Sequence, residues 1–600
     1  MKFAHVLKAN QKTELPSNYI FVDTETWFQD KNDLTFHNLK LGVAKFVRLK
    51  SARSDISEKT ICFSKTKEFW DAADKFCLDK TKTYLYAHNQ HFDFFVLQGV
   101  TSLTALGWDL KNFFVDSNIF MMRWKKENKT LEILDSGNIL KTQLAEIGKA
   151  LGLPKLEVDF NNVDSLKLYD YCERDVEILK RWMLNFREFI KEHDLGNFKK
   201  TIASQAFAAY RHRFMKQPIY IHDNKQAIKL ERESYFGGRT EAFSIGILEK
   251  QNYTLLDVNS MYPFIMRNNA FPTMLLKHIK NPSPAEFFGY LKSYGVIAKV
   301  KILTNEPVFP IRTSKALFPI GEFETVLNTP ELQYASENGM ILNVKEMNVY
   351  QMDSIFTEYI DFFYNLKKRY KEEKNGAMYL LSKLFMNSLY GKFGQKSTIY
   401  KFIEKCDPSI QLIISGGDAI TYKPVTDYFL AGKHFRSFGE SESFDTFVAV
   451  ASHVTAYARL YLWRLIKTAG MENVFYCDTD SLLVNQKGLY NLKKFIDPRE
   501  LGMLDSELES ENIIIRGPKD YDFGIKKKLK GIKNNAENLG NNTFQQEQFL
   551  KFRTLMRSGL TQSAVVKRVV KHLQRKYDKG KVLKSGRVAP YSLPEDAAFF

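Results

Sequence analysis

Short apolar runs that end in acidic residues recur along the chain and predict buried strands with carboxylates at their ends. The clearest case lies at residues 474–484, where two apolar runs flank Asp478-Thr479-Asp480 and predict a buried hairpin with an acidic turn. A second apolar run ends at Asp257. Two carboxylates in a buried turn require a cation to neutralise them. A lysine or arginine would serve, but hard oxygen ligands presented together favour Mg²⁺; a solvated hairpin turn is the alternative for this stretch taken alone.

The first two hundred residues repeat this alternation of apolar elements and acids. Residues 19–22 predict a strand that runs into Asp23-Thr24-Glu25-Thr26, where the alternating acids at the strand end share one face. Residues 84–87 predict a second strand followed by a polar loop and a helix. Residues 169–179 have helical periodicity, with Tyr171 one turn before an aspartate. The acids expected to converge from these three elements are Asp23, Glu25, Asp93 and Asp175. Four acids cannot all ionise in one pocket without metal, so the pattern implies two divalent ions.

The middle of the chain mixes helical and strand-like patterns. Residues 352–374 are amphipathic at helical spacing, and a second helix follows the turn at Asn375-Gly376. This antiparallel pair is typical of a short helical hairpin. Residues 288–350 carry many turn signals and predict a β-rich block, and residues 396–444 predict a protruding hairpin because apolar and polar positions alternate there.

Composition supports a fully folded chain with a polyanionic partner. The 600 residues are too many for one core, so two to four domains are expected. The net charge of +18 indicates nucleic acid or another polyanion, although a solvated basic surface is the simpler alternative and charge alone does not separate nucleic acid from an anionic membrane. No apolar run is long enough for a spanning helix, and the start of the chain is too short and polar for a signal peptide. The five cysteines lack CxxC spacing and are expected to be reduced and mostly buried.

Three acidic and basic segments occur in the order of a known set of motifs. Residues 257–263 resemble motif A of family B DNA polymerases, Dxx(S)xYP. Residues 383–391 resemble motif B, Kx3NSxYG, and residues 476–481 resemble motif C, YxDTDS. Each motif is moderately specific and the ordered set is highly specific. The resemblance implies DNA-dependent DNA synthesis by two-metal phosphoryl transfer, in which the primer 3′-oxygen attacks the α-phosphate and pyrophosphate leaves.

The N-terminal elements resemble the DxE, Nx2–3(F/Y)D and Yx3D motifs of proofreading 3′–5′ exonucleases of the DEDDy type. The resemblance implies that one ion activates water, the other stabilises the leaving 3′-oxygen, and Tyr171 orients the water. The residues predicted at the frayed primer end are Asn89 and Phe92, with Thr26 and His88 as further candidates. Lys155 either assists this site or belongs to the plain surface, and Glu173 and Glu177 are predicted to form a solvated helix face.

The resemblance also assigns roles around the polymerase motifs. Asp257 and Asp480 would be the main ligands of two Mg²⁺ ions, with Mn²⁺ as a substitute, Val258 would contribute its backbone, and Asp478 would be a nearby third acid. Tyr262 would lie under the incoming sugar and exclude a 2′-hydroxyl. The residues assigned to the nucleotide are Tyr262, Lys383, Asn387, Tyr390 and, within a lysine run that a solvated face explains equally well, Lys371.

Three further segments are assigned to DNA. Tyr235, Gly237 and Gly238 are similar to the YxG(G/A) motif and would hold the template. Thr455 and Arg459 are close to the TxxAR motif and would bind the primer terminus. Lys519 and Tyr521 resemble the KxY motif, which would reach a primer phosphate.

The fold class implied is α/β and α+β, with several domains: an RNase H-like exonuclease domain ahead of a right-hand palm, fingers and thumb module. Two insertions match the protein-primed branch of the family by position. The domains implied are the exonuclease at 1–200, palm at 201–290, a first insertion resembling terminal protein region 1 at 291–350, fingers at 351–395, a second insertion resembling terminal protein region 2 at 396–445, palm at 446–515, and thumb with a basic C-terminal segment at 516–600.

The expected partners are primer–template DNA, deoxynucleotides and a terminal protein whose hydroxyl replaces the primer hydroxyl at initiation. A polymerase of the same chemistry that extends ordinary primers is the alternative for the priming mode, and a catalytically silent nucleic-acid-binding scaffold is the alternative from another class. The scaffold predicts missing carboxylates, and every motif carboxylate is present. We expect a monomer without a membrane, in the cytoplasm of an infected host cell rather than in a mitochondrion.

Overall fold

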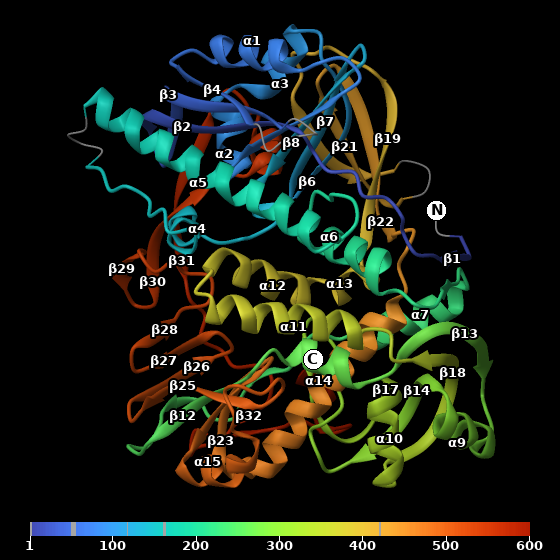
Figure 1. Cartoon of the computed structure of the whole chain (residues 1–600). Helices are drawn as coiled ribbons and strands as arrows, with labels where there is room; N and C mark the ends of the chain where they lie inside the picture. Colours follow the sequence, from blue (N-terminus) through green and yellow to red (C-terminus); the bar gives the residue numbers. More distant parts are fainter. Residues whose placement is uncertain (1–2, 50–55, 117, 160–163, 419–421, 600) are drawn as a thin grey trace.

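An N-terminal sheet covered by one long helix occupies one end of the molecule (Figure 1). The computed structural model describes residues 3–49, 56–116, 118–159, 164–418 and 422–599. The central strand β2 pairs with β3 on one side and β5 on the other, and α5 packs across β2 and β3. The strands are β2 (Asn18–Lys31), β3 (Leu34–Leu49), β4 (Ile56–Phe63), β5 (Lys82–Ala87), β6 (Asp109–Val115), β7 (Phe120–Lys126) and β8 (Lys129–Asp135). The helices are α1 (Thr66–Phe76), α2 (Gln90–Val96), α3 (Gly99–Ala105), α4 (Leu144–Ala150) and α5 (Ser165–Glu192).

Two sequence predictions about this domain are wrong. Strand β2 does not end at the two acids, Asp23 and Glu25, but continues to Lys31, because β3 pairs with it along its whole length. Nor do Glu173 and Glu177 form a solvated face: both carboxylates pair with the buried Lys45 ammonium on β3, at 2.6 Å for Glu177. These ion pairs, with those to two basic neighbours on α5, outweigh desolvation and lower the pKa of Glu177 to about 2.

A five-stranded sheet forms the centre of the other end of the molecule. It has the order β10-β23-β24-β12-β25, and the hairpin β23–β24 is the one predicted from residues 474–484. Helix α14 (Val448–Ala469) is buried along almost its whole length beside this sheet. The strands are β10 (Thr240–Ala242), β12 (Tyr253–Val258), β23 (Val474–Asp478), β24 (Ser481–Asn485) and β25 (Leu504–Ser510).

A seven-stranded sheet lies beside α14 and contains the predicted β-rich block. The block begins earlier than predicted, at β13, and it includes two helices, α9 (Pro284–Ser293) and α10 (Thr329–Glu337). One of the turn signals in the predicted block, Asn328-Thr329-Pro330, is instead the start of α10, which Asn328 caps. The strands, in spatial order, are β1 (His5–Leu7), β9 (Ile219–Ile221), β13 (Phe271–Lys280), β18 (Ile341–Asp353), β14 (Gly295–Thr304), β17 (Ile320–Asn328) and β34 (Ser592–Leu593). We call residues 271–353 the inserted sheet.

Two antiparallel helices, α11 (Thr357–Glu372) and α12 (Gly376–Ser388), lie between the two ends of the molecule (Figure 1). They confirm the predicted helical pair, although the first helix starts five residues later than predicted because Met352 and Asp353 still belong to β18. A short helix, α13 (Tyr390–Phe393), follows.

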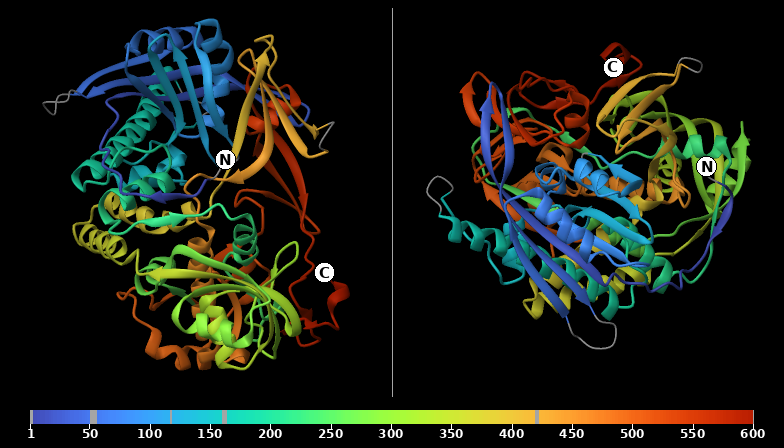
Figure 2. Two further views of the ribbon diagram at one scale, coloured as in Figure 1. Left: turned by 90° about the vertical axis from the view of Figure 1, so that its right-hand side faces the viewer. Right: turned by 90° about the horizontal axis from the view of Figure 1, so that it is seen from above.

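Residues 396–442 form four antiparallel strands rather than the single hairpin predicted. The order is β19-β22-β21-β20, and the Tyr400 ring packs against Phe113 of the N-terminal domain at 4.4 Å between centroids. The strands are β19 (Lys396–Lys405), β20 (Leu412–Gly417), β21 (Pro424–Leu430) and β22 (Lys433–Glu442). Figure 2 shows this sheet beside the N-terminal domain.

The C-terminal segment connects the two ends of the molecule instead of standing apart. Strand β31 (Ala564–His572) pairs with β3, so that β29 (Glu537–Gly540), β30 (Thr543–Phe549) and β31 extend the N-terminal sheet. The preceding strands β26 (Ile513–Gly517), β27 (Asp520–Phe523) and β28 (Lys526–Lys528) form a four-stranded sheet with β11 (Gly246–Ile247), in the order β11-β26-β27-β28. Strands β29–β31 run up from the lower end of the molecule to the N-terminal domain (Figure 2). Within the described part of the chain, no helix is long and apolar enough to cross a membrane.

Candidate active sites

The strand that ends in Asp257 lies next to the hairpin that carries Asp478 and Asp480. Strand β12 pairs with β24 so that Asp257 stands opposite Ser481, and the Val258 N–H donates to the Asp480 carbonyl at 2.8 Å. The structure therefore brings together acids that are more than two hundred positions apart in the sequence. Together they line a cavity of about 350 Å³.

The carboxylates of this cluster are half-buried and repel one another. Burial, together with Asp480 and Glu507, raises the pKa of Asp257 to about 7. Burial and the nearby Asp478 carboxylate also raise the pKa of Asp480. Such a set of oxygen donors fits one or two Mg²⁺ ions, because a divalent cation removes both the repulsion and the cost of burial. Glu507, on β25, was missed in the sequence. The pairing of β25 with β12 sets Asp505 opposite Asp257 and brings Glu507 to the same cavity, and this long-range pairing leaves no local signal.

Asp478 is held by groups on both sides of the turn. The Lys519 ammonium donates to its two carboxylate oxygens at 2.9 and 2.6 Å, and the Thr240 hydroxyl donates at 3.0 Å. Lys519 thus lies at the acidic turn, and its predicted contact with a primer phosphate stays a prediction. The Tyr521 ring is largely buried and stacks on Phe523 at 4.0 Å, but it also lines the acidic cavity, so its predicted contact with DNA stays a prediction.

A basic pocket of about 620 Å³ faces the same acids from the helical pair. Lys383 and Asn387 on α12 line it, as predicted, together with Lys371 on α11. The lysine run therefore borders the pocket, while Lys371 itself is exposed to solvent there. Lys367 was missed; its ammonium donates to the Ser260 hydroxyl at 3.2 Å. Its spacing of four residues from Lys371 on a helix was the signal available in the sequence.

The Lys367 ammonium is the most perturbed cation of this pocket. Burial, reinforced by the neighbouring lysines, lowers the pKa of Lys367 to about 8. A pocket in which lysines repel one another is stabilised by an anion such as a triphosphate. At the pocket's edge, the Tyr262 and Tyr390 rings stack at 4.9 Å with an interplanar angle of 28°.

The predicted template loop reaches the acidic turn with its backbone. A β-carbon on Gly238 would stand 2.8 Å from the Thr479 Cγ2 atom, so this glycine is needed for a contact inside the protein rather than with a ligand. No described atom lies within 4 Å of the equivalent position on Gly237. The Tyr235 ring packs on Gly394, and the Tyr235 carbonyl accepts a hydrogen bond from Arg312.

The prediction that Thr455 and Arg459 contact the primer is wrong. Both lie inside α14's buried face and are 2% and 3% exposed, which leaves no surface for a phosphate. The Thr455 hydroxyl donates to helix carbonyls, as at Ser452 at 3.1 Å. Arg459 pairs with Glu331 at 2.7 Å.

The four N-terminal acids converge as predicted. Asp23 and Glu25 lie on β2. The Asp93 carboxylate, on α2, accepts a hydrogen bond from the Thr24 hydroxyl at 2.7 Å. Burial and the neighbouring carboxylates raise the pKa of Asp23. Burial raises the pKa of Asp93 to about 8. Burial and the nearby Asp175 carboxylate raise the pKa of Glu25 to about 7. The buried Oδ1 atom of Asp175 has no hydrogen-bond partner in the described part of the chain. This orphaned oxygen and the crowded acids fit divalent metal ions.

Two other groups belong to this cluster. The Lys155 ammonium contacts Asp175 and lies 4.5 Å from the centroid of the Tyr171 ring, so Lys155 is part of the site and not plain surface. The Cys172 sulfur, which no motif singled out, lies 3.5 Å from the Asp23 Oδ2 atom.

The residues predicted at the frayed primer end differ in their exposure and in their contacts with the protein. Asn89 is exposed in a left-handed conformation (φ 79°) at the start of α2. The Phe92 ring makes edge contacts with His37 and Phe549, at 5.3 and 5.8 Å between centroids. The Thr26 hydroxyl shares a hydrogen bond with His37 at 2.9 Å, and the His88 ring is engaged by Ser136 at 2.8 Å.

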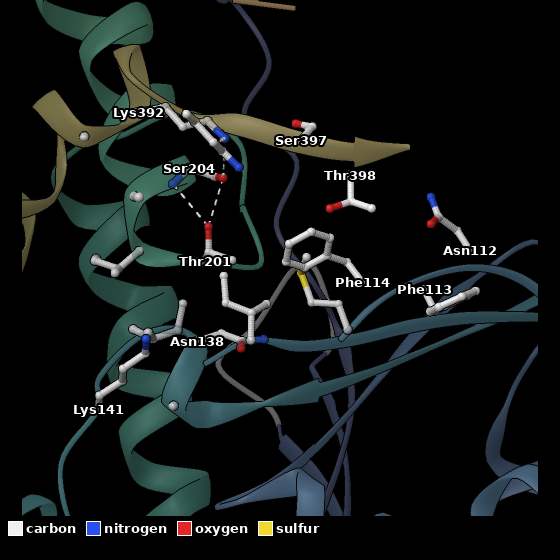
Figure 3. A pocket seen from close by; sticks show the side chains of 18 of the residues that line it. Asn112, Phe113, Phe114, Asn138, Lys141, Thr201, Ser204, Lys392, Ser397 and Thr398 are labelled. Atoms are coloured by element: carbon white, nitrogen blue, oxygen red, sulfur yellow. Dashed lines mark hydrogen bonds between the residues drawn. The ribbon is translucent and has the colours of Figure 1, made fainter. Parts of the chain in front are cut away.

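A groove of about 1050 Å³ lies where the N-terminal domain, α13 and β19 meet (Figure 3). Its wall carries the Lys392 ammonium, which donates to the Ser204 hydroxyl at 3.3 Å, and the aromatic rings of Phe113 and Phe114. Burial lowers the pKa of Lys392. Cations and aromatic faces along one groove are the features that single-stranded nucleic acid requires.

Comparison with known proteins identifies the class. A family model described as DNA polymerase type B, organellar and viral, matches residues 156–469, more than half of the chain, and the chain belongs to this family. A probable DNA polymerase of Neurospora intermedia is 29% identical over 382 residues, which are 60% of this chain and 38% of that protein. A DNA-directed DNA polymerase of Enterobacteria phage PRD1 is 32% identical over 301 residues, 48% of this chain and 49% of that protein. The chain thus spans less than half the length of these relatives.

The fold is that of a solved polymerase. The structure of Phi29 DNA polymerase complexed with primer-template DNA and incoming nucleotide substrates aligns with a TM-score of 0.66 at 16% identity, covering 93% of this chain and 100% of that one. This likeness confirms the predicted mixed α/β architecture with several domains.

Proposed function

We propose that the protein is a DNA-dependent DNA polymerase with a second, 3′–5′ exonuclease site. The observation that carries the proposal is the meeting of Asp257 with the Asp478–Asp480 turn, opposite a pocket lined by lysines. Acids that hold cations on one wall and ammonium groups on the other match the charges of a deoxynucleoside triphosphate and a primer end. Family membership and fold support the same reaction.

In the polymerase site, Asp257 and Asp480 would hold two Mg²⁺ ions, with the backbone of Val258 beside them. Bound Mg²⁺ would lower the pKa of the attacking hydroxyl and neutralise charge on the phosphates. Lys367 and Lys383 would bind the triphosphate, and the Tyr262 ring would lie under the sugar and exclude a 2′-hydroxyl.

In the N-terminal site, Asp23, Glu25, Asp93 and Asp175 would hold the metal ions that hydrolyse a terminal phosphodiester. Tyr171, whose ring lies under the Lys155 ammonium, would orient the attacking water. The Lys155 ammonium would in turn fix Asp175, whose carboxylate it contacts.

The priming mode is proposed from the insertions. The inserted sheet and the β19–β22 sheet occupy the positions of the two insertions of the protein-primed branch, so we infer that a terminal protein supplies the first hydroxyl. The alternative is extension of ordinary primers alone. Initiation without oligonucleotide, in the presence of the cognate terminal protein, separates the two: formation of a protein–deoxynucleotide conjugate supports protein priming, and its absence together with normal primer extension supports the alternative.

The experiment that tests the main proposal is template-directed incorporation of deoxynucleotides on a primed template with Mg²⁺. The wild type should extend the primer and should shorten a single-stranded oligonucleotide from its 3′ end. Asp175→Asn should abolish only the second activity, because it lies in the N-terminal cluster, and Asp257→Asn should abolish only the first. Loss of both activities in each variant would contradict two separate sites.

A further inference from the structure

The loop at residues 235–240, which was predicted to bind template, is joined to the acidic turn by three contacts. The Thr479 N–H donates to the Arg239 carbonyl at 2.7 Å, and the Thr240 hydroxyl donates to Asp478 at 3.0 Å. The third contact is the close approach of Gly238 to Thr479. Thr479 has a φ of 67°, a left-handed conformation that a threonine adopts only when its surroundings hold it there. The loop therefore determines the shape of the turn.

The opposite side of this loop is held by a buried arginine. The Arg459 Nη1 atom donates to the carbonyls of Phe236 at 2.9 Å and Gly237 at 3.1 Å, and its Nη2 atom donates to the Glu331 carboxylate at 2.7 Å. Both members of the pair are almost inaccessible, at 3% and 2% exposure. The planar guanidinium links the loop and the carboxylate in fixed directions, which a lysine cannot do.

Glu331 belongs to the inserted sheet's helix α10, which lies beside α14 (Figure 1). Its second oxygen accepts the Asn328 N–H at 3.2 Å, so its position is fixed by the start of that helix. The Asn328 side chain in turn donates to the Ser234 carbonyl at 3.3 Å, just before the loop. The Arg312 guanidinium, also from this region, bonds the Tyr235 carbonyl.

We infer that Glu331 and Arg459 are positioning residues of the polymerase reaction, through which the inserted sheet holds the 235–240 loop and thereby the Asp478–Asp480 turn. This inference rests on the proposed polymerase function. A buried ion pair gains little net stability over an apolar pair of similar volume, because desolvation offsets the attraction. The contribution of the pair is instead to position the loop, because the Arg459 guanidinium donates to the carbonyls of Phe236 and Gly237. The inserted sheet is thus a structural part of the active site as well as a surface available to a partner.

The test compares Arg459→Lys and Glu331→Gln with Lys467→Met. Lys467 lies two turns further along α14 and pairs with Glu306, at 2.7 Å, across the same interface, but its ammonium does not contact the loop. The measurements are kcat and the KM for deoxynucleotide in single-nucleotide incorporation, Kd for primer–template, hydrolysis of a single-stranded 3′ end, and hydrogen exchange of a peptide that contains Thr479.

Both test variants should lose about 100-fold in kcat, the scale expected when reacting groups are misplaced by about 1 Å, with little change in KM or in DNA affinity. Exchange at the turn should accelerate, while hydrolysis at the N-terminal site stays as in the wild type. Lys467→Met should change neither kcat nor exchange at the turn.

Unchanged kcat in both test variants would overturn the inference. So would a rise in the Kd for primer–template with kcat preserved, because that result would assign Arg459 to DNA directly. Equal acceleration of exchange throughout the molecule would show a general structural role and would also overturn it. If the wild type itself incorporates no nucleotide, the proposed function fails and the inference falls with it.

Discussion

Gly238 lies so close to Thr479 that a β-carbon on the glycine would be 2.8 Å from the Thr479 Cγ2 atom. Real β-carbon contacts are never that short, so Gly238→Ala must displace either the loop or the acidic turn. We expect a loss of about 100-fold in nucleotide incorporation, with hydrolysis of a single-stranded 3′ end unchanged. Gly237→Ala is the matched control, because its β-carbon would point into open space among the described residues and its φ is not in the left-handed region. Equal losses in the two variants would contradict the proposed contact.

The pKa of Lys367 gives the polymerase reaction a predictable pH dependence. The free ammonium has a pKa of about 8, below its ordinary value, because it is buried among other lysines. A bound triphosphate favours the charged form, so its affinity is full below that pKa and declines as pH rises through about 8. The measurement is the KM for dATP, whose base does not ionise in that range. Lys367→Arg stays charged and should flatten the profile; a profile that is equally steep in this variant would exclude Lys367 as the cause.

The rate of hydrolysis at the N-terminal site should also depend on pH, because its carboxylates are buried, but this rate should rise with pH. The pKa values of Glu25 and Asp93 are raised to about 7 and 8, so protons compete with Mg²⁺ for these oxygens. The rate of 3′-end hydrolysis should therefore rise with pH through this range. A higher Mg²⁺ concentration should move the rise to lower pH, because metal and proton compete for one site. A rise that Mg²⁺ does not move would contradict metal binding by these two acids.

Local pattern was sufficient for the elements that carry the chemistry. The β23–β24 hairpin, strand β5, helix α5 and the α11–α12 pair each have a periodicity that their own residues determine. The convergence of the four N-terminal acids was expected from the three elements that carry them, and it agrees with the structure.

Long-range pairing was not predictable from local pattern. The pairing of β31 with β3 joins residues more than five hundred positions apart, and the extension of β2 beyond Asp23 depends on β3. The burial of Arg459 could not be predicted either, because an arginine on a helix is ordinarily exposed and its partner Glu331 comes from another part of the fold. The low pKa of Lys367 could not be predicted from local pattern either, because it depends on burial and on the approach of Lys383 from another helix.

The groove of Figure 3 predicts a contact with the unpaired template strand. Lys392→Ala should weaken binding of a primer–template that has a single-stranded 5′ template overhang, because one buried cation of the groove is lost. Binding of a blunt duplex should be unaffected. Lys401→Ala, an exposed lysine on the same sheet outside the groove's described lining, is the control. Equal weakening for overhang and blunt DNA would show that Lys392 does not contact the unpaired strand.

The central claim is that Asp257 and Asp480 share one set of metal ions in a polymerase site. Single-turnover incorporation on a primed template with Mg²⁺ tests it most directly, in the wild type and in Asp480→Asn. We predict that the variant loses about three orders of magnitude in rate while it shortens a single-stranded 3′ end as fast as the wild type. Equal incorporation by the two proteins would contradict the claim.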